Sequence, residues 1–199
     1  GIRRIFDLAA GLDQTVDLSI GQPHFPTPEP VRRALANAVE DGHNGYSPSP
    51  GIPPLREALQ QRIDSHYQHD NRRVMVTSGT SGGLVLALCT LVDPGDEVIL
   101  PAYTFVTTAN AFVLLGAQPV FVDIDPTTLN MDPSAIEACI TDRTKAIVPV
   151  HYAGVGCDMD AIGDLAKRHG LTVIEDAAQG VNAFYRGQAL GSLGQLGTF

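Results

Sequence analysis

From residue 72 onward, short apolar runs alternate with longer stretches of helical character. Runs that are apolar on both faces indicate the strands of a parallel sheet with helices on both sides. We therefore predict an α/β fold in a three-layer α/β/α arrangement with a mostly parallel sheet. The predicted strands are 74–76, 97–100, 119–122, 146–150 and 171–174, and the predicted helices are 83–92, 107–115, 133–140 and 159–169.

The first seventy residues lack the strand–helix alternation of the rest of the chain. Prolines clustered between positions 23 and 54 break this stretch into loops around two helices. One predicted helix runs from about Glu29 to Asp41, with a proline in its first turn and a glycine just after its end. A second starts near Pro53. We predict an N-terminal arm with helices over 1–70 and part of a larger α/β domain over 71–199.

Composition and charge narrow the class of protein. The chain of 199 residues is 44% hydrophobic and 18% charged, which is typical of a folded domain. Its formal net charge of -9 disfavours nucleic-acid and anionic-membrane partners. No apolar run is long enough to span a bilayer, and the first residues carry no apolar signal segment. The widely spaced Cys89, Cys139 and Cys157 favour reduced thiols, so we expect a cytoplasmic protein.

A run of small residues, S-G-T-S-G-G at 78–83, follows the first predicted strand and turns into a helix. A helix N-terminus offers unpaired N–H donors and a partial positive charge, which together favour a phosphate. The hydroxyls of Ser78, Thr80 and Ser81 add further donors. The alternative is a helix cap without a ligand. A dinucleotide-binding domain is disfavoured, because the spacing matches neither G-x-G-x-x-G nor G-x-x-x-x-G-K-[ST].

Glu175 and Asp176 end the last predicted strand. Ligands of parallel sheets bind at the carboxyl ends of the strands, so Asp176 shares an edge with the small-residue turn. A carboxylate there can keep the ring nitrogen of pyridoxal phosphate (PLP) protonated, as its electron-sink chemistry requires. The alternatives are an acid that caps the next turn, or a metal ligand. The nearest metal-type cluster, His151 and Asp158, has no recognised ligand spacing.

Two halves of the chain resemble two groups of fold-type I PLP-dependent aminotransferases. Residues 17–101 resemble the class I/II amino-acid aminotransferases, and residues from about 101 to 199 resemble the DegT-type nucleotide-sugar aminotransferases, the 4-keto-6-deoxy sugar enzymes above all. The first resemblance rests on D-L-S-I-G-Q-P at 17–23, F-P-T-P at 25–28, G-Y-S-P at 45–48, G-I-P-P-L-R at 51–56 and D-P-G-D-E-V-I at 93–99. The second rests on Y-T-F-V-T-T-A-N-A-F at 103–112, F-V-D-I at 121–124, V-P-V-H-Y-A-G at 148–154 and I-E-D-A-A-Q-G at 174–180. Our hypothesis is a recombinant, or chimera, joined near 96–102 inside a common fold.

The resemblance implies a role for each residue that matches a cofactor contact of these families. The implied contacts are Ser78, Gly79 and Thr80 to the phosphate, Phe105 stacked on the pyridine ring, Asp176 to its nitrogen, Gln179 to the ring face or ring oxygen, and Tyr46 to the phosphate of a neighbouring subunit. The last contact implies a homodimer with a shared site. Phe105 is alternatively a core aromatic, and Tyr46 a loop residue.

The Schiff-base lysine of these families has no counterpart in the sequence. In the DegT-type pattern it follows a few residues after the stretch that ends here at Phe199. The chain has only Lys145 and Lys167, and their sequence positions fit a strand start and a solvated helix face. We therefore expect an incomplete large domain with no catalytic residue of its own.

The function implied by the resemblance is transamination with small-molecule substrates. The amino donor would be an amino acid, with glutamate expected, and the acceptor a keto sugar nucleotide or a keto acid. The alternative is a non-catalytic chimeric or fragment domain that keeps only the cofactor cradle.

Overall fold

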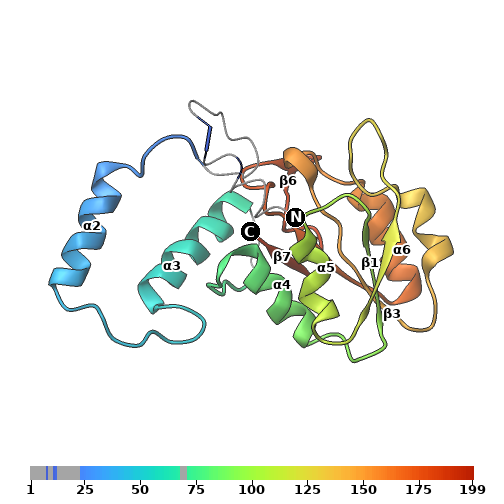
Figure 1. Ribbon diagram of the computed structural model, residues 1–199, viewed down its shortest axis with the longest axis horizontal. Coiled ribbons are helices and arrows are strands. Elements are labelled where there is room, and N and C mark those ends of the chain that lie inside the picture. Colours follow the sequence, from blue (N-terminus) through green and yellow to red (C-terminus); the bar gives the residue numbers. More distant parts are fainter. Residues whose placement is uncertain (1–7, 9–10, 13–22, 68–70) are drawn as a thin grey trace. The chain divides into compact units, whose positions relative to one another are not determined.

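The computed structural model describes residues 8, 11–12, 23–67 and 71–199 (Figure 1). The chain divides into two compact units, Gly1–Tyr46 and Ser47–Phe199. The first contains α2 (Glu29–Glu40), which begins directly after Pro28 and places a second proline in its first turn, as predicted. No helix in the described ranges combines the length and the apolar character that crossing a bilayer requires.

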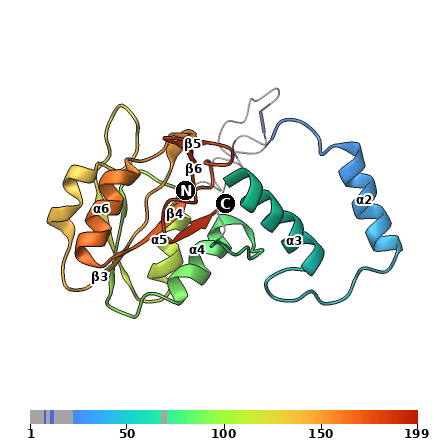
Figure 2. The same ribbon diagram turned by 180° about the vertical axis from the view of Figure 1, so that it is seen from behind.

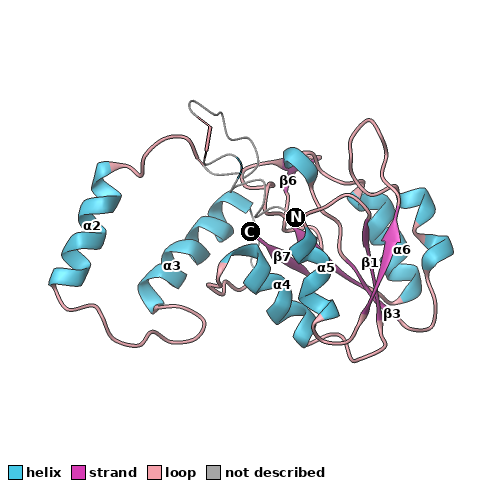
Figure 3. Ribbon diagram, viewed as in Figure 1, coloured by secondary structure: helices cyan, strands magenta, loops and turns pink. Residues whose placement is uncertain are grey.

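The second unit is built on a parallel sheet (Figure 3). The strand order is β2-β1-β3-β4-β7, and every pair is parallel. The strands are β1 (Glu97–Pro101), β2 (Gln118–Val122), β3 (Thr144–Ile147), β4 (Thr172–Asp176) and β7 (Leu196–Thr198), and a separate antiparallel hairpin joins β5 (Phe184–Tyr185) to β6 (Gln188–Ala189). The helical segments are α3 (Pro53–Arg62), η1 (Ile63–Tyr67), α4 (Gly79–Cys89), α5 (Val106–Val113), η2 (Pro133–Ala135), η3 (Glu137–Cys139), η4 (Tyr152–Gly154) and α6 (Met159–His169).

Helices cover both faces of this sheet (Figures 1 and 2). Along β1, Val98 and Leu100 pack with α4 and α5, whereas Ile99 packs with α6. Likewise Ile174 of β4 belongs to the α4–α5 side and Val173 to the α6 side. Because successive residues of a strand point to opposite faces, each strand contributes to both cores. The predicted three-layer α/β/α fold with a parallel sheet is confirmed.

The predicted strand at 74–76 is wrong. This segment is not part of any strand, and its backbone N–H groups bond elsewhere. Val74 N–H donates to the side chain of Gln60 at 3.1 Å, and Val76 N–H donates to the carbonyl of Pro50 at 3.0 Å. α3 and the loop before it therefore hold the segment in place of a neighbouring strand.

The predicted helix at 133–140 is also wrong, since two 3₁₀ turns occupy this stretch. The Asp132 carboxylate accepts from both the N–H and the hydroxyl of Ser134, at 2.9 and 2.7 Å. Ile136 and Ile140 then donate to carbonyls three residues earlier, at 3.3 Å each. These i→i+3 bonds close tighter turns than an α-helix allows.

Candidate cofactor site

The small-residue run forms the first turn of α4 itself, because the helix begins at Gly79 rather than at the predicted residue 83. Ser78 is the N-cap residue, but its side chain makes no capping hydrogen bond. Gly79 has a φ of +66°, a conformation that favours glycine, and a Cβ built there would meet nothing within 4 Å. The Gly79 N–H already donates to the Thr77 carbonyl at 2.9 Å, so the donor left without a capping bond is the Ser78 hydroxyl, beside the open space at Gly79.

A groove of about 730 Å³ opens beside this turn. Ser78, Ser81 and Gly82 line it from the helix, and Ser47 and Met75 line it from the segments opposite. Apolar side chains, among them Val76, Val85 and Leu86, share the wall with these hydroxyls, and the predicted phosphate contacts Gly79 and Thr80 do not line the groove. The hydroxyls nearest the N-terminus of α4 are at the end of a helix that favours an anion.

β7 contacts both α4 and the end of β4. A Cβ at Gly83 would lie 2.9 Å from the side-chain methyl of Thr198, so helix and strand are in close contact. Thr198 is the register partner of Asp176. Its carbonyl accepts from Ala177 N–H at 2.9 Å, and its hydroxyl donates to the Glu175 carbonyl at 3.2 Å. The first turn of α4 and Asp176 therefore belong to one edge of the sheet.

The carboxylate of Asp176 is buried and oriented by two donors. The Thr108 hydroxyl donates to Oδ2 at 2.8 Å, and the Ala178 N–H donates to Oδ1 at 3.2 Å. Thr108 is itself 1% exposed, and its hydroxyl lies 3.1 Å from that of Thr104. Because a carboxylate has about four acceptor positions, Asp176 can still accept a hydrogen bond from a ligand nitrogen. The sequence analysis did not identify Thr108, although it lies inside the quoted 103–112 motif.

Phe105 and Gln179 stand at the same edge, in the loops that follow β1 and β4. Phe105 is the N-cap residue of α5, and its side chain is 65% exposed, so its reading as a core aromatic is excluded. Its stacking role stays a prediction. Gln179 accepts the Ala153 N–H at 2.5 Å, which directs its carboxamide toward η4. Ala153 has a φ of +53°, so this hydrogen bond supports a turn that alanine adopts unfavourably.

The two lysines lie apart from these residues, and Tyr46 belongs to the first unit. Tyr46 is the last residue of the first unit and its ring is fully exposed, so its contact with a neighbouring subunit stays a prediction. Lys145 is exposed at the amino end of β3, and Lys167 is exposed in the last turn of α6. Since Asp176 ends β4, the structure places Lys145 at the opposite edge of the sheet.

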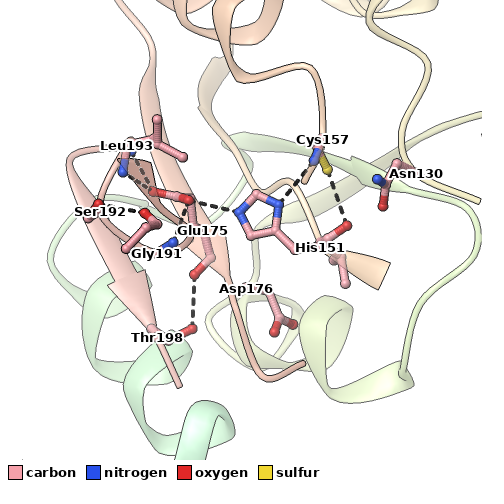
Figure 4. A network of polar contacts seen from close by, with 12 residues as sticks. Asn130, His151, Cys157, Glu175, Asp176, Gly191, Ser192, Leu193 and Thr198 are labelled. Carbon is pink, nitrogen blue, oxygen red and sulfur yellow. Dashed lines mark hydrogen bonds and ion pairs between the residues drawn. The ribbon is translucent and has the colours of Figure 1, made fainter. Parts of the chain in front are cut away.

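A buried pair, His151 and Glu175, lies on the other side of β4 from Asp176 (Figure 4). Both side chains are completely buried, and His151 Nε2 lies 2.8 Å from Glu175 Oε2. The same carboxylate accepts the N–H groups of Gly191 at 2.7 Å, Leu193 at 2.7 Å and Gly194 at 2.5 Å. Four donors thus converge on one buried carboxylate and fill its acceptor positions.

The tautomer of His151 follows from its second contact. Nδ1 accepts the Cys157 N–H at 3.2 Å, so the proton sits on Nε2 and is donated to Glu175. The sequence analysis grouped His151 with Asp158 as a possible metal cluster. Instead, Asp158 caps α6 by accepting the Ala161 N–H at 3.2 Å. His151 is therefore committed to the buried network.

Two tyrosines form a second pair, one in the loop after β1 and the other at the start of η4. The hydroxyls of Tyr103 and Tyr152 lie 3.1 Å apart and their ring centroids 5.0 Å apart. The hydrogen bond from Tyr103 raises the pKa of Tyr152 above its ordinary value. Asn130 fixes the backbone of η4 by accepting the Tyr152 N–H at 3.0 Å. The pair thus has a defined orientation.

We expect the cysteines to differ sharply in reactivity. Burial raises the pKa of Cys157 to about 12, whereas Cys89 is exposed. Because the thiolate is the reactive species, iodoacetamide at mildly alkaline pH should alkylate Cys89 and spare Cys157 in the folded protein. Peptide mass mapping after short and long exposures measures this. Equal labelling of both residues under native conditions would contradict the burial of Cys157, and labelling in urea provides the control.

The parallel sheet, the small-residue first turn of α4 and the buried Asp176 define the large domain of a fold-type I PLP-dependent transferase. Solved structures support this class. The chain has a TM-score of 0.73 and 33% identity to 3-amino-5-hydroxybenzoic acid (AHBA) synthase, over 86% of this chain and 44% of that one. It has a TM-score of 0.73 and 31% identity to an aminotransferase from Psychrobacter cryohalolentis, over 87% and 42%. For a variant of Thermus thermophilus aspartate aminotransferase the values are 0.73 and 32%, over 80% and 46%.

The chain belongs to the DegT/DnrJ/EryC1/StrS aminotransferase family, whose sequence profile matches residues 55–199. It is also 56% identical over 108 residues to a pleiotropic regulatory protein of Geobacillus stearothermophilus, which covers 54% of this chain and 29% of that protein. The chain thus spans less than half the length of these relatives. The family match begins inside the stretch that resembles class I/II enzymes, and the aspartate aminotransferase variant shares the fold as well. Recombination near 96–102 stays a hypothesis.

Proposed function

We propose that this chain is part of a PLP-dependent aminotransferase, and that its own residues hold the phosphate and the pyridine ring of the cofactor. The single observation that supports this most is the buried Asp176 carboxylate, fixed by Thr108 and Ala178 at the edge where α4 begins. The fit extends to the phosphate end, because the uncommitted Ser78 hydroxyl and the open space at Gly79 leave room for an anion.

Bound PLP would supply an electron sink that is effective when its ring nitrogen is protonated. Asp176 would hold that proton on the nitrogen, and Thr108 would keep the carboxylate oriented toward it. Ser78, Gly79 and Thr80 would hold the phosphate with hydroxyl and N–H donors, and Phe105 would cover one face of the ring. Gln179 would contact the ring while its carboxamide oxygen stays bonded to η4.

For substrates we propose glutamate as amino donor and a nucleotide-linked 4-keto sugar as acceptor, with a keto acid as the alternative acceptor. Membership in the DegT/DnrJ/EryC1/StrS family and the motifs at 103–180 support the sugar acceptor. The class I/II resemblance of the first half supports the keto acid. We also propose a homodimer in which Tyr46 reaches the phosphate of the partner subunit's cofactor.

A second candidate concerns these 199 residues by themselves. Both lysines are exposed, and Lys145 lies at the sheet edge remote from Asp176. Since the covalent chemistry of PLP enzymes needs a lysine beside the cofactor, we propose non-covalent PLP binding without transamination at a useful rate.

The test is a PLP titration of the purified chain by absorbance, followed by borohydride reduction and peptide mass mapping. We expect saturable binding of one equivalent and no lysine adduct. Absence of binding would overturn the cofactor assignment. A stoichiometric adduct on Lys145 or Lys167 would overturn our placement of the lysines, and NAD binding in place of PLP would favour a dinucleotide site.

A further inference from the structure

The loop over 191–195, which leads directly into β7, is held on one side by Arg72. Its guanidinium donates to three loop carbonyls, those of Gln195 at 2.7 Å, Ser192 at 3.0 Å and Gly194 at 2.6 Å. The backbone carbonyl of Arg72 in turn accepts from the Gln60 side chain at 3.0 Å. α3 therefore holds Arg72, which in turn binds the loop.

The other side of the same loop is held by Glu175, which accepts three of its N–H groups. The peptide between Ser192 and Leu193 is bound at both ends. Its carbonyl oxygen accepts from Arg72 at 3.0 Å, and its N–H donates to Glu175 at 2.7 Å. A peptide dipole aligned between a cation and an anion is favourable with both charges, and strongly so away from water.

We propose that Arg72 and Glu175 are positioning residues that act as one clamp through the Ser192–Leu193 peptide. The clamp sets β7 against β4, and thereby holds Thr198 between Asp176 and the first turn of α4. The inference rests on the proposed function insofar as this edge receives PLP.

β7, the strand that the clamp positions, is too short for its pairing with β4 alone to hold it in place. β7 pairs with β4 over three residues only. A pairing of this length is weak by itself, and the close contact of Thr198 with Gly83 requires β7 to be placed accurately. The loop before it includes Gly191 with a φ of +81°, which packs directly against Phe199. Hydrogen bonds to Arg72 and Glu175 can fix this irregular backbone at a place too crowded for a side chain on Gly191.

The two charges should show energetic coupling. In Glu175→Gln one acceptor oxygen becomes an NH₂ donor, which then faces a backbone N–H or the His151 Nε2–H. In Arg72→Met three carbonyls lose their donor. Because both side chains bind the same peptide, losing either one should loosen that peptide, and losing both should have a smaller effect than the sum of the two single changes. Arg186→Met and Glu137→Gln are matched controls, since Arg186 forms a surface pair with Asp160 and Glu137 forms one with Arg168.

The first readout is hydrogen exchange and needs no cofactor. We expect the amides of Leu193, Gly194 and β7 to exchange about tenfold faster in each single variant, with amides of α6 unchanged as evidence of an intact fold. The double variant should add little to either single change. Unchanged loop exchange, or strictly additive effects, would overturn the clamp, and the controls should match the parent chain.

The second readout separates this inference from the cofactor assignment. With ¹⁵N-labelled PLP, each clamp variant should bind about tenfold more weakly and shift the pyridine nitrogen signal toward the unprotonated form. If the parent chain binds no PLP, the proposed function fails and hydrogen exchange alone decides the clamp. If the parent binds and the variants bind equally well with an unchanged nitrogen signal, the positioning role is wrong.

Discussion

Replacing Asp176 by alanine is expected to weaken PLP binding by about ten- to a hundredfold, the range of a hydrogen bond to a charged group. Asp176→Ala removes the proposed acceptor for the ring nitrogen and leaves the Thr108 hydroxyl and the Ala178 N–H without the carboxylate they bind. Titration of parent and variant under the same conditions measures the ratio of dissociation constants.

Asp176→Asn separates charge from shape. Asparagine keeps the size of the side chain and one acceptor oxygen but not the negative charge, so bound PLP should lose the protonated pyridine signal in ¹⁵N spectra. Asp160→Ala is the control, because Asp160 lies in the first turn of α6 and pairs with Arg186 at the surface. Equal affinity of parent and Asp176→Ala would show that the ring binds elsewhere.

Gly197→Ala should lower the free energy of unfolding by about 3 kcal/mol, since it forces an overlap that backbone must relieve. A Cβ at Gly197 would overlap the carbonyl oxygen of Gly191 across the turn. Neither group is the flexible end of a side chain, so the backbone of β7 or of the turn at Gly191 must shift. Urea denaturation followed by circular dichroism measures the loss.

The matched control is Gly163→Ala within α6. A Cβ there meets nothing within 4 Å, so alanine should be neutral or raise the free energy of unfolding by up to about 1 kcal/mol. If Gly197→Ala behaved like this control, β7 would not lie where the structure places it.

The sequence predicted the layers of the fold because they depend on local patterns. β1 and β2 are apolar runs with clear ends, and α6 matches its predicted range of 159–169. β7 was not predicted, since Leu196-Gly197-Thr198 contains a glycine and has no apolar run. The segment at 74–76 has the composition of a strand, but its N–H groups bond to the Gln60 side chain and the Pro50 carbonyl instead of to a neighbouring strand.

The candidate site divides in the same way. Asp176 and the small-residue turn stand in contiguous motifs, so a single sequence was sufficient to propose them as candidate cofactor contacts. The role of Glu175 depends on the backbone N–H groups of Gly191, Leu193 and Gly194. Since every residue except proline has a backbone N–H, the sequence does not show which of them bind a given carboxylate. The role of Arg72 is hidden for the same reason, because all its loop partners are carbonyls.

The contact between Gly83 and Thr198 also bears on the order of events during translation. Residues 78–83 leave the ribosome early, but the strand that supports their helix is made more than a hundred residues later. Contacts so distant along the chain form slowly. The first turn of α4 should therefore reach its final geometry only after β7 has emerged, so that the proposed cofactor site forms no earlier than the synthesis of residues 196–198.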